Sequence, residues 1–178
     1  MSKDTGLRAI TDHLQDLWRL GNFSFNNPRN LTKFRQIKAV ARESGAQCLI
    51  ESGTYRGHTT KRCVPVFKNI VTVEIDESLA RDAKQFLKNS SNVEVVQGDV
   101  IDSLPGILAR DDMHDILVYL DGHFSGGITG RGQSDEPACD AINVLSEYRD
   151  KLSAIIVDDF REFGHRGGAK KIRTDWCL

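Results

Sequence analysis

Hydrophobic positions follow two different spacings along the chain. Residues 7–20 and 31–46 carry apolar residues three or four positions apart, which predicts two leading amphipathic helices. The pattern then changes to short apolar runs, which predict strands, at residues 47–50, 69–73, 92–96, 115–120 and 154–157. Segments with helical spacing separate these runs, at residues 58–67, 77–89, 102–110 and 138–152. This alternation predicts an α/β fold, with a doubly wound, mostly parallel sheet covered by helices on both faces.

The pattern contains no repeat and no linker, so we expect a single domain over residues 1–178. Within it, residues 1–44 form the leading helices, residues 46–159 a cofactor-binding core and residues 160–178 a short tail. One glycine-rich stretch, residues 122–137, fits no regular element. It begins where the fourth strand ends, so it is either a surface loop or a lid, and its position slightly favours the lid.

Composition and charge narrow the range of partners. The chain has 24 Lys and Arg residues against 25 Asp and Glu residues, a net charge of −1, which gives no electrostatic footprint for nucleic acid or anionic lipid. We therefore expect a small-molecule partner, no nucleic acid and no membrane. No apolar run reaches the roughly 20 residues that cross a bilayer, and the first residues lack the apolar core of a signal peptide, so a cytoplasmic location is expected. Four scattered cysteines predict buried thiols rather than a zinc site or a disulfide framework.

Each of the five predicted strands ends at acidic residues. The carboxyl ends of parallel strands meet at one edge of the sheet, where doubly wound folds bind their ligands. A single acid there is commonly a helix cap, but a full set at one opening would repel one another. Something positive or rich in hydroxyl groups should therefore sit among them. The acids are Glu51, Glu74, Asp99, Asp121, Asp158 and Asp159.

The turn after the first strand reads ESGTYRG, and its two glycines, Gly53 and Gly57, let the backbone bend sharply and approach a ligand. Its spacing differs from the GxGxxG of dinucleotide-binding proteins. Glu51 would repel a pyrophosphate, but a carboxylate accepts hydrogen bonds from an ammonium group. Glu74 suits the hydroxyls of a ribose and Asp99 the amino group of an adenine. Together they describe S-adenosylmethionine, although each residue alone is as readily a turn glycine, a cap or a surface acid.

From Leu31 to Asp159 the chain resembles the class I S-adenosylmethionine-dependent methyltransferases, and among them the divalent-metal-dependent O-methyltransferases of the catechol type. The resemblance lies in five segments, LIESGTYRGHTT, TVEIDE, VVQGDVIDSLP, VYLDGH and IIVDDF. It implies that the methionine part of the cofactor, the ribose and the adenine are each held by a separate group of residues. These are Glu51, Gly53, Tyr55, Gly57 and Thr59 for methionine, Glu74 for ribose, and Asp99 and Val100 for adenine, with Asp121 also beside the cofactor.

The same resemblance implies a divalent metal ion held by Asp121, Asp158 and Asp159. Carboxylate oxygens are the ligands that Mg²⁺ prefers, and such an ion would orient the acceptor and lower the pKa of its hydroxyl group. Two readings stay open here. Either the three acids bind a metal, or Asp158 and Asp159 cap a helix and Asp121 contacts only the cofactor.

The chain also departs from the catechol-type enzymes. Where those enzymes carry a lysine base, three residues after the fourth-strand acid, this chain has Phe124. His123 is the nearest titratable side chain and either acts as the catalytic base together with Asp121 or hydrogen-bonds within the loop. The tail shows no pattern for the usual C-terminal antiparallel strand pair, which leaves the fifth strand as an open edge or the chain shortened. Trp176 and Leu178 then suggest contacts between subunits of a homo-oligomer.

Three functions follow from these features. The first is S-adenosylmethionine-dependent O-methylation of a small hydroxylated acceptor with the help of Mg²⁺ or another divalent cation. The second is a methyltransferase-like protein that binds the cofactor without turnover, which the missing lysine favours. The third is a nucleotide-dependent oxidoreductase, which the glycine spacing disfavours.

Overall fold

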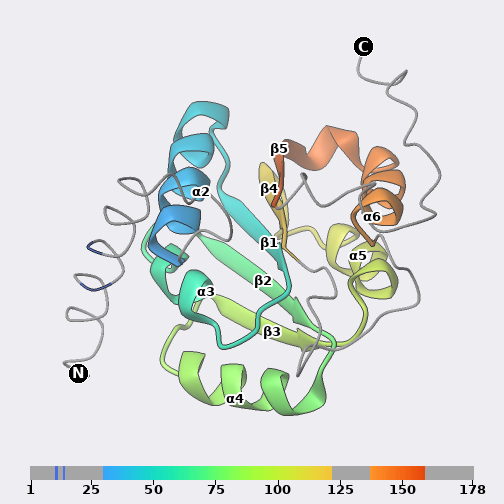
Figure 1. Cartoon of the computed structure of the whole chain (residues 1–178). Helices are drawn as coiled ribbons and strands as arrows, with labels where there is room; N and C mark the ends of the chain where they lie inside the picture. The colour runs from blue at the N-terminus through green and yellow to red at the C-terminus, as the bar shows by residue number, and fades with distance from the viewer. Residues whose placement is uncertain (1–10, 12–13, 15–29, 122–136, 159–178) are drawn as a thin grey trace, which may run out of the picture.

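The computed structural model describes residues 11, 14, 30–121 and 137–158, and residues 30–121 and 137–158 build one parallel sheet with helices on both faces (Figure 1). The five strands are β1 (Cys48–Ser52), β2 (Asn69–Glu74), β3 (Val93–Gln97), β4 (Ile116–Leu120) and β5 (Leu152–Val157). The helices are α2 (Asn30–Ser44), α3 (His58–Cys63), α4 (Glu77–Leu87), α5 (Val100–Leu108) and α6 (Pro137–Ser146), and a short 3₁₀ turn, η1 (Arg149–Lys151), precedes β5. The predicted α/β class and doubly wound, Rossmann-like sheet are therefore confirmed.

The strand order is β3-β2-β1-β4-β5, and all four pairings are parallel. Strand order reverses between β1 and β4, so the switch point that binds ligands in such sheets lies at their carboxyl ends. The register places Ser52 level with Leu120, and Leu120 level with Val157. The residues that follow β4 and β5, Asp121 and Asp158, are consequently side by side at this switch point.

Alternation of side chains sends the strands' apolar residues into two cores. On one face Ile50, Val71 and Val118 pack against α5 and α6, and on the other Leu49 and Leu117 pack against α2 and the end of α3. Figure 1 shows α2 and α3 on one side of the sheet and α5 and α6 on the other. Strands β1 and β4 are buried along their whole length because neighbours and helices cover them on every side.

The structure ends one predicted helix, α3, early and shifts another, α5, towards the N-terminus. Helical spacing covered residues 58–67, but α3 ends at Cys63, because Pro65 has no backbone N–H to continue the helical hydrogen bonds. At α5 the helix begins earlier than its apolar pattern, at Val100, since the Asp99 carboxylate accepts a hydrogen bond from the backbone N–H of Ile101 at 2.8 Å.

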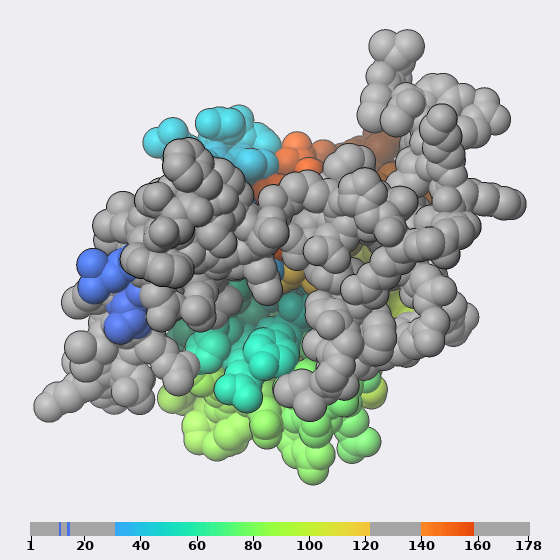
Figure 2. Space-filling model, viewed as in Figure 1, coloured from blue at the N-terminus to red at the C-terminus, as the bar shows by residue number. Residues whose placement is uncertain are grey.

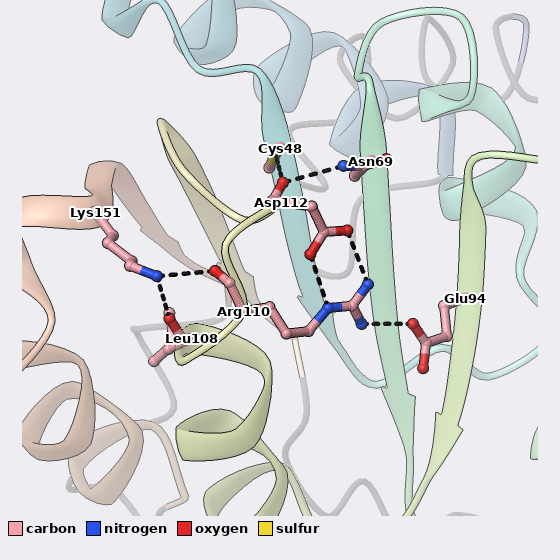
Figure 3. A network of polar contacts seen from close by, with 7 residues as sticks. All are labelled: Cys48, Asn69, Glu94, Leu108, Arg110, Asp112 and Lys151. Atoms are coloured by element: carbon pink, nitrogen blue, oxygen red, sulfur yellow. Dashed lines mark hydrogen bonds and ion pairs between the residues drawn. The ribbon is translucent and has the colours of Figure 1, made fainter.

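A polar network closes the opposite edge of the sheet, where β1 and β2 begin (Figure 3). Arg110 forms an ion pair with Asp112 at 3.0 Å and another with Glu94 at 2.6 Å. The Lys151 ammonium donates hydrogen bonds to the carbonyls of Leu108 and Arg110, which are left open where α5 ends. These contacts connect the ends of α5 and the strands at this edge, whereas sheets of this kind bind ligands at the opposite, carboxyl edge.

Strand β5 lies at one end of the sheet and pairs only with β4 among the described residues, and its Ile155 is 40% exposed. The tail that would cover or extend this edge lies outside the described residues, as does the glycine-rich stretch after Asp121. The expected open edge and homo-oligomer therefore stay predictions. Cys48 and Cys63 are free and buried, as expected. Within the part of the chain that the structure describes, no helix has the length and apolar character of a membrane span.

Candidate functional site

The turn between β1 and α3 bends through three residues in the left-handed region, Gly53 with φ 85°, Tyr55 with φ 49° and Gly57 with φ 71°. Its first residues are anchored on β2, because the backbone N–H of Gly53 donates to the carbonyl of Val73 at 2.9 Å. A Cβ at Gly57 would lie 3.0 Å from Leu87 Cδ1 on α4. Glycine is required there both by φ and by this close approach.

Glu51, at the end of β1, is enclosed by the protein. Its side chain is 1% exposed, and its Oε2 accepts hydrogen bonds from the hydroxyls of Thr60 on α3 and Thr72 on β2, the latter at 2.8 Å. Burial raises the pKa of Glu51 to about 7, against the lowering effect of the two hydroxyls and of the Lys33 charge. Glu51 therefore joins β1, β2 and α3, and the predicted contact with a cofactor ammonium stays a prediction.

Glu74, at the end of β2, fastens the glycine-containing turn to the sheet. Its Oε2 accepts a hydrogen bond from the backbone N–H of Tyr55 at 2.7 Å, and its Oε1 accepts one from the N–H of Asp76 at 3.1 Å. The residue is 6% exposed. The structure thus places Glu74 against the turn, and its binding of ribose stays a prediction. Thr59, the other predicted residue of this region, is buried at the start of α3.

Asp99 and Val100, predicted to lie by adenine, form the start of α5. The carboxylate of Asp99 caps this helix, and the Ser103 hydroxyl donates to the Asp99 carbonyl at 2.7 Å. Val100 packs against the core on the α5 side of the sheet. Helix capping, the alternative weighed for Asp99, is therefore its observed role, and binding of adenine stays a prediction.

Asp121 and Asp158 lie together at the switch point, and a lysine sits between them. The Lys33 ammonium, carried by α2, is 2.7 Å from Asp121 Oδ2 and 2.7 Å from Asp158 Oδ2. The Tyr119 hydroxyl also donates to Asp158 Oδ2, at 2.8 Å. The side chains of Lys33 and Asp158 are each 11% exposed and that of Asp121 is 18% exposed. We call Lys33, Asp121, Asp158 and Tyr119 the Lys33 cluster.

Burial and pairing act against each other in the Lys33 cluster. Burial raises the pKa of Asp121 to about 7, with the nearby Lys33 charge pulling it down. Burial also acts upward on Asp158, but hydrogen bonds from Lys33 and Tyr119 outweigh it and hold the pKa of Asp158 below its ordinary value. Burial would lower the pKa of Lys33, yet the two carboxylates raise it, so the lysine stays charged. The expectation of a positive group and hydroxyls among the acids is met by the protein's own side chains.

The expected divalent metal ion is not supported. A divalent metal ion requires oxygen ligands that are free to bind it, but the Lys33 ammonium lies between Asp121 and Asp158. No group of three His, Cys, Asp or Glu residues suited to a metal occurs among the described residues. Asp159 and the predicted base His123 lie outside the described residues.

Lys33 is the residue that the sequence reasoning missed. It lies four residues before Ile37 and eight before Ala41, both buried on the inner face of α2. A lysine among the buried positions of a helix is unusual without a charged partner. The place of Lys33 in the helical pattern was therefore the sequence signal that could have identified it.

The fold is that of a class I S-adenosylmethionine-dependent methyltransferase, and the family that the sequence matches supports S-adenosylmethionine as the cofactor. The family model described as Ribosomal RNA adenine dimethylase matches residues 23–121, more than half of the chain. The chain therefore belongs to the ribosomal RNA adenine dimethylase family.

Individual relatives agree with this fold. The chain is 30% identical over 90 residues to Ribosomal RNA small subunit methyltransferase A of Mycoplasma capricolum, a match that covers 50% of this chain and 34% of that protein. The structure is similar to a Staphylococcus aureus protein named after caffeoyl-CoA O-methyltransferase, at TM-score 0.54 and 15% identity, covering 83% of this chain and 65% of that one. A Bacillus cereus O-methyltransferase solved with SAH matches at TM-score 0.50 and 20% identity, over 74% and 59% of the two chains. The chain spans about a third of the length of the curated relative.

The family corrects one prediction from composition. Exclusion of nucleic acid as a partner was wrong, because the matching family is named for ribosomal RNA and so is the Mycoplasma relative. The error came from treating a net charge of −1 as evidence about the whole surface. A net charge averages over all faces and does not exclude a local basic or aromatic contact surface.

Proposed function

We propose that this chain is the cofactor-binding core of a methyltransferase that transfers the methyl group of S-adenosylmethionine to the amino group of an adenine in RNA. The observation that carries the proposal is the family match, which runs through β1 to β4 and ends at Asp121. The O-methylation expected from the sequence is less well supported, since Lys33 stands where its metal ion would bind.

The strand ends suit such a transfer. A sulfonium methyl group is already activated, so the protein must mainly hold the acceptor nitrogen in line with it. The lone pair of an adenine amino group is delocalised into the ring, and a carboxylate that accepts its N–H hydrogen bond makes the nitrogen a better nucleophile. Asp121 lies at the switch point, its side chain is 18% exposed, and burial raises its pKa towards the range of a proton acceptor that works near neutral pH. We assign it this role.

A surface beside the glycine-containing turn has the chemistry that unpaired RNA requires. Tyr55 is 44% exposed, and the Arg56 guanidinium lies over its ring, 5.4 Å from the centroid. Next to them His58 meets Phe86 of α4 edge-on at 5.0 Å, and Phe86 is 40% exposed. Figure 2 shows the β1–α3 segment and α4 exposed on the same face. Aromatic rings and arginine planes stack with splayed-out bases.

The proposal is tested with S-adenosylmethionine labelled on its methyl group. Acceptors are small-subunit ribosomal RNA, a single-stranded oligoribonucleotide containing adenines, the same oligonucleotide with uridine at those positions, and catechol with Mg²⁺. We expect label only in the adenine-containing RNAs, recovered after digestion as adenosine methylated on its amino group. Label in catechol would contradict the acceptor assignment. Cofactor binding by calorimetry without transfer to any acceptor would favour the binding protein without turnover.

A matched pair of variants tests the RNA surface. Arg56→Ala should weaken binding of the adenine-containing oligonucleotide several-fold in fluorescence anisotropy at fixed salt, because it removes both a stacking partner and a phosphate contact. Arg42→Ala removes another exposed arginine, from the last turn of α2, and serves as the control. Equal effects of the two substitutions would show only a general charge effect and would remove this surface from the proposal.

A further inference from the structure

We propose that Lys33 is the resident cation of the acid pair at the switch point, so that Asp121 and Asp158 are held in place without a metal ion. In this role Lys33 is a positioning residue, since it acts through the two carboxylates. The inference concerns how the chain builds its site and does not depend on RNA being the acceptor.

The fold makes a cation necessary at this place. Because Leu120 and Val157 are level in neighbouring parallel strands, the acids that follow them are side by side. Both are largely withdrawn from water, so their mutual repulsion is poorly screened. Glu51, buried one strand away, adds a further negative charge that also acts on Lys33. A positive charge between the acids removes most of this repulsion.

Lys33 meets this requirement in position and in bonding. Its ammonium is 2.7 Å from an oxygen of each carboxylate, and it also lies 2.7 Å from Asp121 Oδ1. An ammonium carries three donors, and these contacts direct them at the acid pair. The lysine belongs to α2, which precedes the sheet in the chain, so one side chain links α2 to the ends of β4 and β5.

The same geometry leaves no place for a divalent metal ion. Mg²⁺ requires octahedral oxygen ligands at about 2.1 Å, whereas oxygens of both acids already contact the ammonium and one also accepts from Tyr119. A second cation beside Lys33 would be repelled by it. Removing the lysine charge should therefore leave the hard oxygen ligands of the acid pair without a cation and create affinity for a metal.

The experiment compares wild-type protein with Lys33→Met, Lys33→Arg and Lys38→Met after metal has been removed with EDTA. Lys38 is an exposed lysine on the same helix and provides the matched control. Binding of Mn²⁺ is measured by calorimetry and by the shift of the thermal unfolding midpoint. We expect Lys33→Met to bind Mn²⁺ at least about tenfold more tightly than the wild type, a difference of ~1.4 kcal/mol, and to be stabilised by it. Lys33→Arg keeps the charge and should behave as the wild type, as should Lys38→Met.

Two results would overturn the inference. One is a wild-type protein that binds Mn²⁺ as tightly as Lys33→Met; the other is a folded Lys33→Met that binds Mn²⁺ no better than the wild type. If Lys33→Met does not fold, the double variant Lys33→Met with Asp158→Asn tests the inference by its ability to fold. Because it removes one negative charge together with the positive one, it should recover folding, and failure to recover would show that Lys33 does not act through the acid pair.

Discussion

The free energy of unfolding of Glu51→Gln, relative to that of the wild type, should increase as the pH rises. Burial raises the pKa of Glu51 in the folded protein from 4.5 to about 7. Between these values the folded state holds a proton that the unfolded chain has lost, so rising pH lowers the free energy of unfolding. The difference of 2.5 pKa units corresponds to about 3 kcal/mol, which is fully lost above pH 7.

Glu51→Gln keeps the shape of the protonated acid and an oxygen that accepts from Thr60 and Thr72, but it cannot ionise. Its stability relative to the wild type should therefore be nearly constant below about pH 4 and rise by about 3 kcal/mol by pH 8, with most of the rise between pH 5 and pH 8. Asp121 titrates near the same pH, but it is present in both proteins and cancels in the difference.

The assay is urea denaturation of both proteins at intervals from pH 5 to pH 8.5, with Glu43→Gln as a control because Glu43 is an exposed acid on α2. The control should show no comparable change with pH. A Glu51→Gln difference that is the same at pH 5 and pH 8 would refute the reasoning, since it would mean that Glu51 is ionised in the folded protein at acidic pH.

Two further pairs of substitutions test the hydrogen bond to Glu51 and the close contact at Gly57. Thr72→Val should cost about 1–3 kcal/mol of unfolding free energy because it removes a hydroxyl that donates to the buried Glu51, whereas Thr72→Ser should recover most of this loss in the same denaturation assay. Gly57→Ala should cost more than Gly45→Ala, since both glycines have φ near +70° (71° and 72°) but only Gly57 has Leu87 within 4 Å of an added Cβ. Equal losses for the two alanine variants would show that the contact with α4 contributes nothing.

The sequence was sufficient for the sheet and for the positions of the acids, because strand spacing is a local pattern and parallel strands bring their ends to one edge. It was not sufficient for the partners of those acids. Lys33 is 88 residues from Asp121 in the chain, and no local pattern reports a contact at that separation. Glu51 Oε2 accepts from the hydroxyls of Thr60 and Thr72, which come from two other elements, and no local pattern indicated these partners.

The metal-dependent interpretation is not supported, for a related reason. Carboxylates that converge at strand ends predict the presence of a cation, and one is present, but residue types alone do not reveal whether the cation is a metal ion or a lysine from another element. The prediction that nucleic acid is not a partner was wrong because the net charge of the whole chain does not describe the charge of each face of the molecule. Phe86 meets His58 and approaches Gly57, beside Arg56, only after α3 and α4 have packed.

The acids at the carboxyl edge divide into two groups once their partners are known. Glu51 and Glu74 use their carboxylates to hold the glycine-containing turn and the strands together, and Asp99 caps α5. Asp158 shares one oxygen between Lys33 and Tyr119. Asp121 is the more exposed acid of the pair bound by Lys33, and it lies at the switch point where the family match ends. Most of the acidic residues are thus needed to build the opening, and this position makes Asp121 the best candidate among them for contact with the reacting groups.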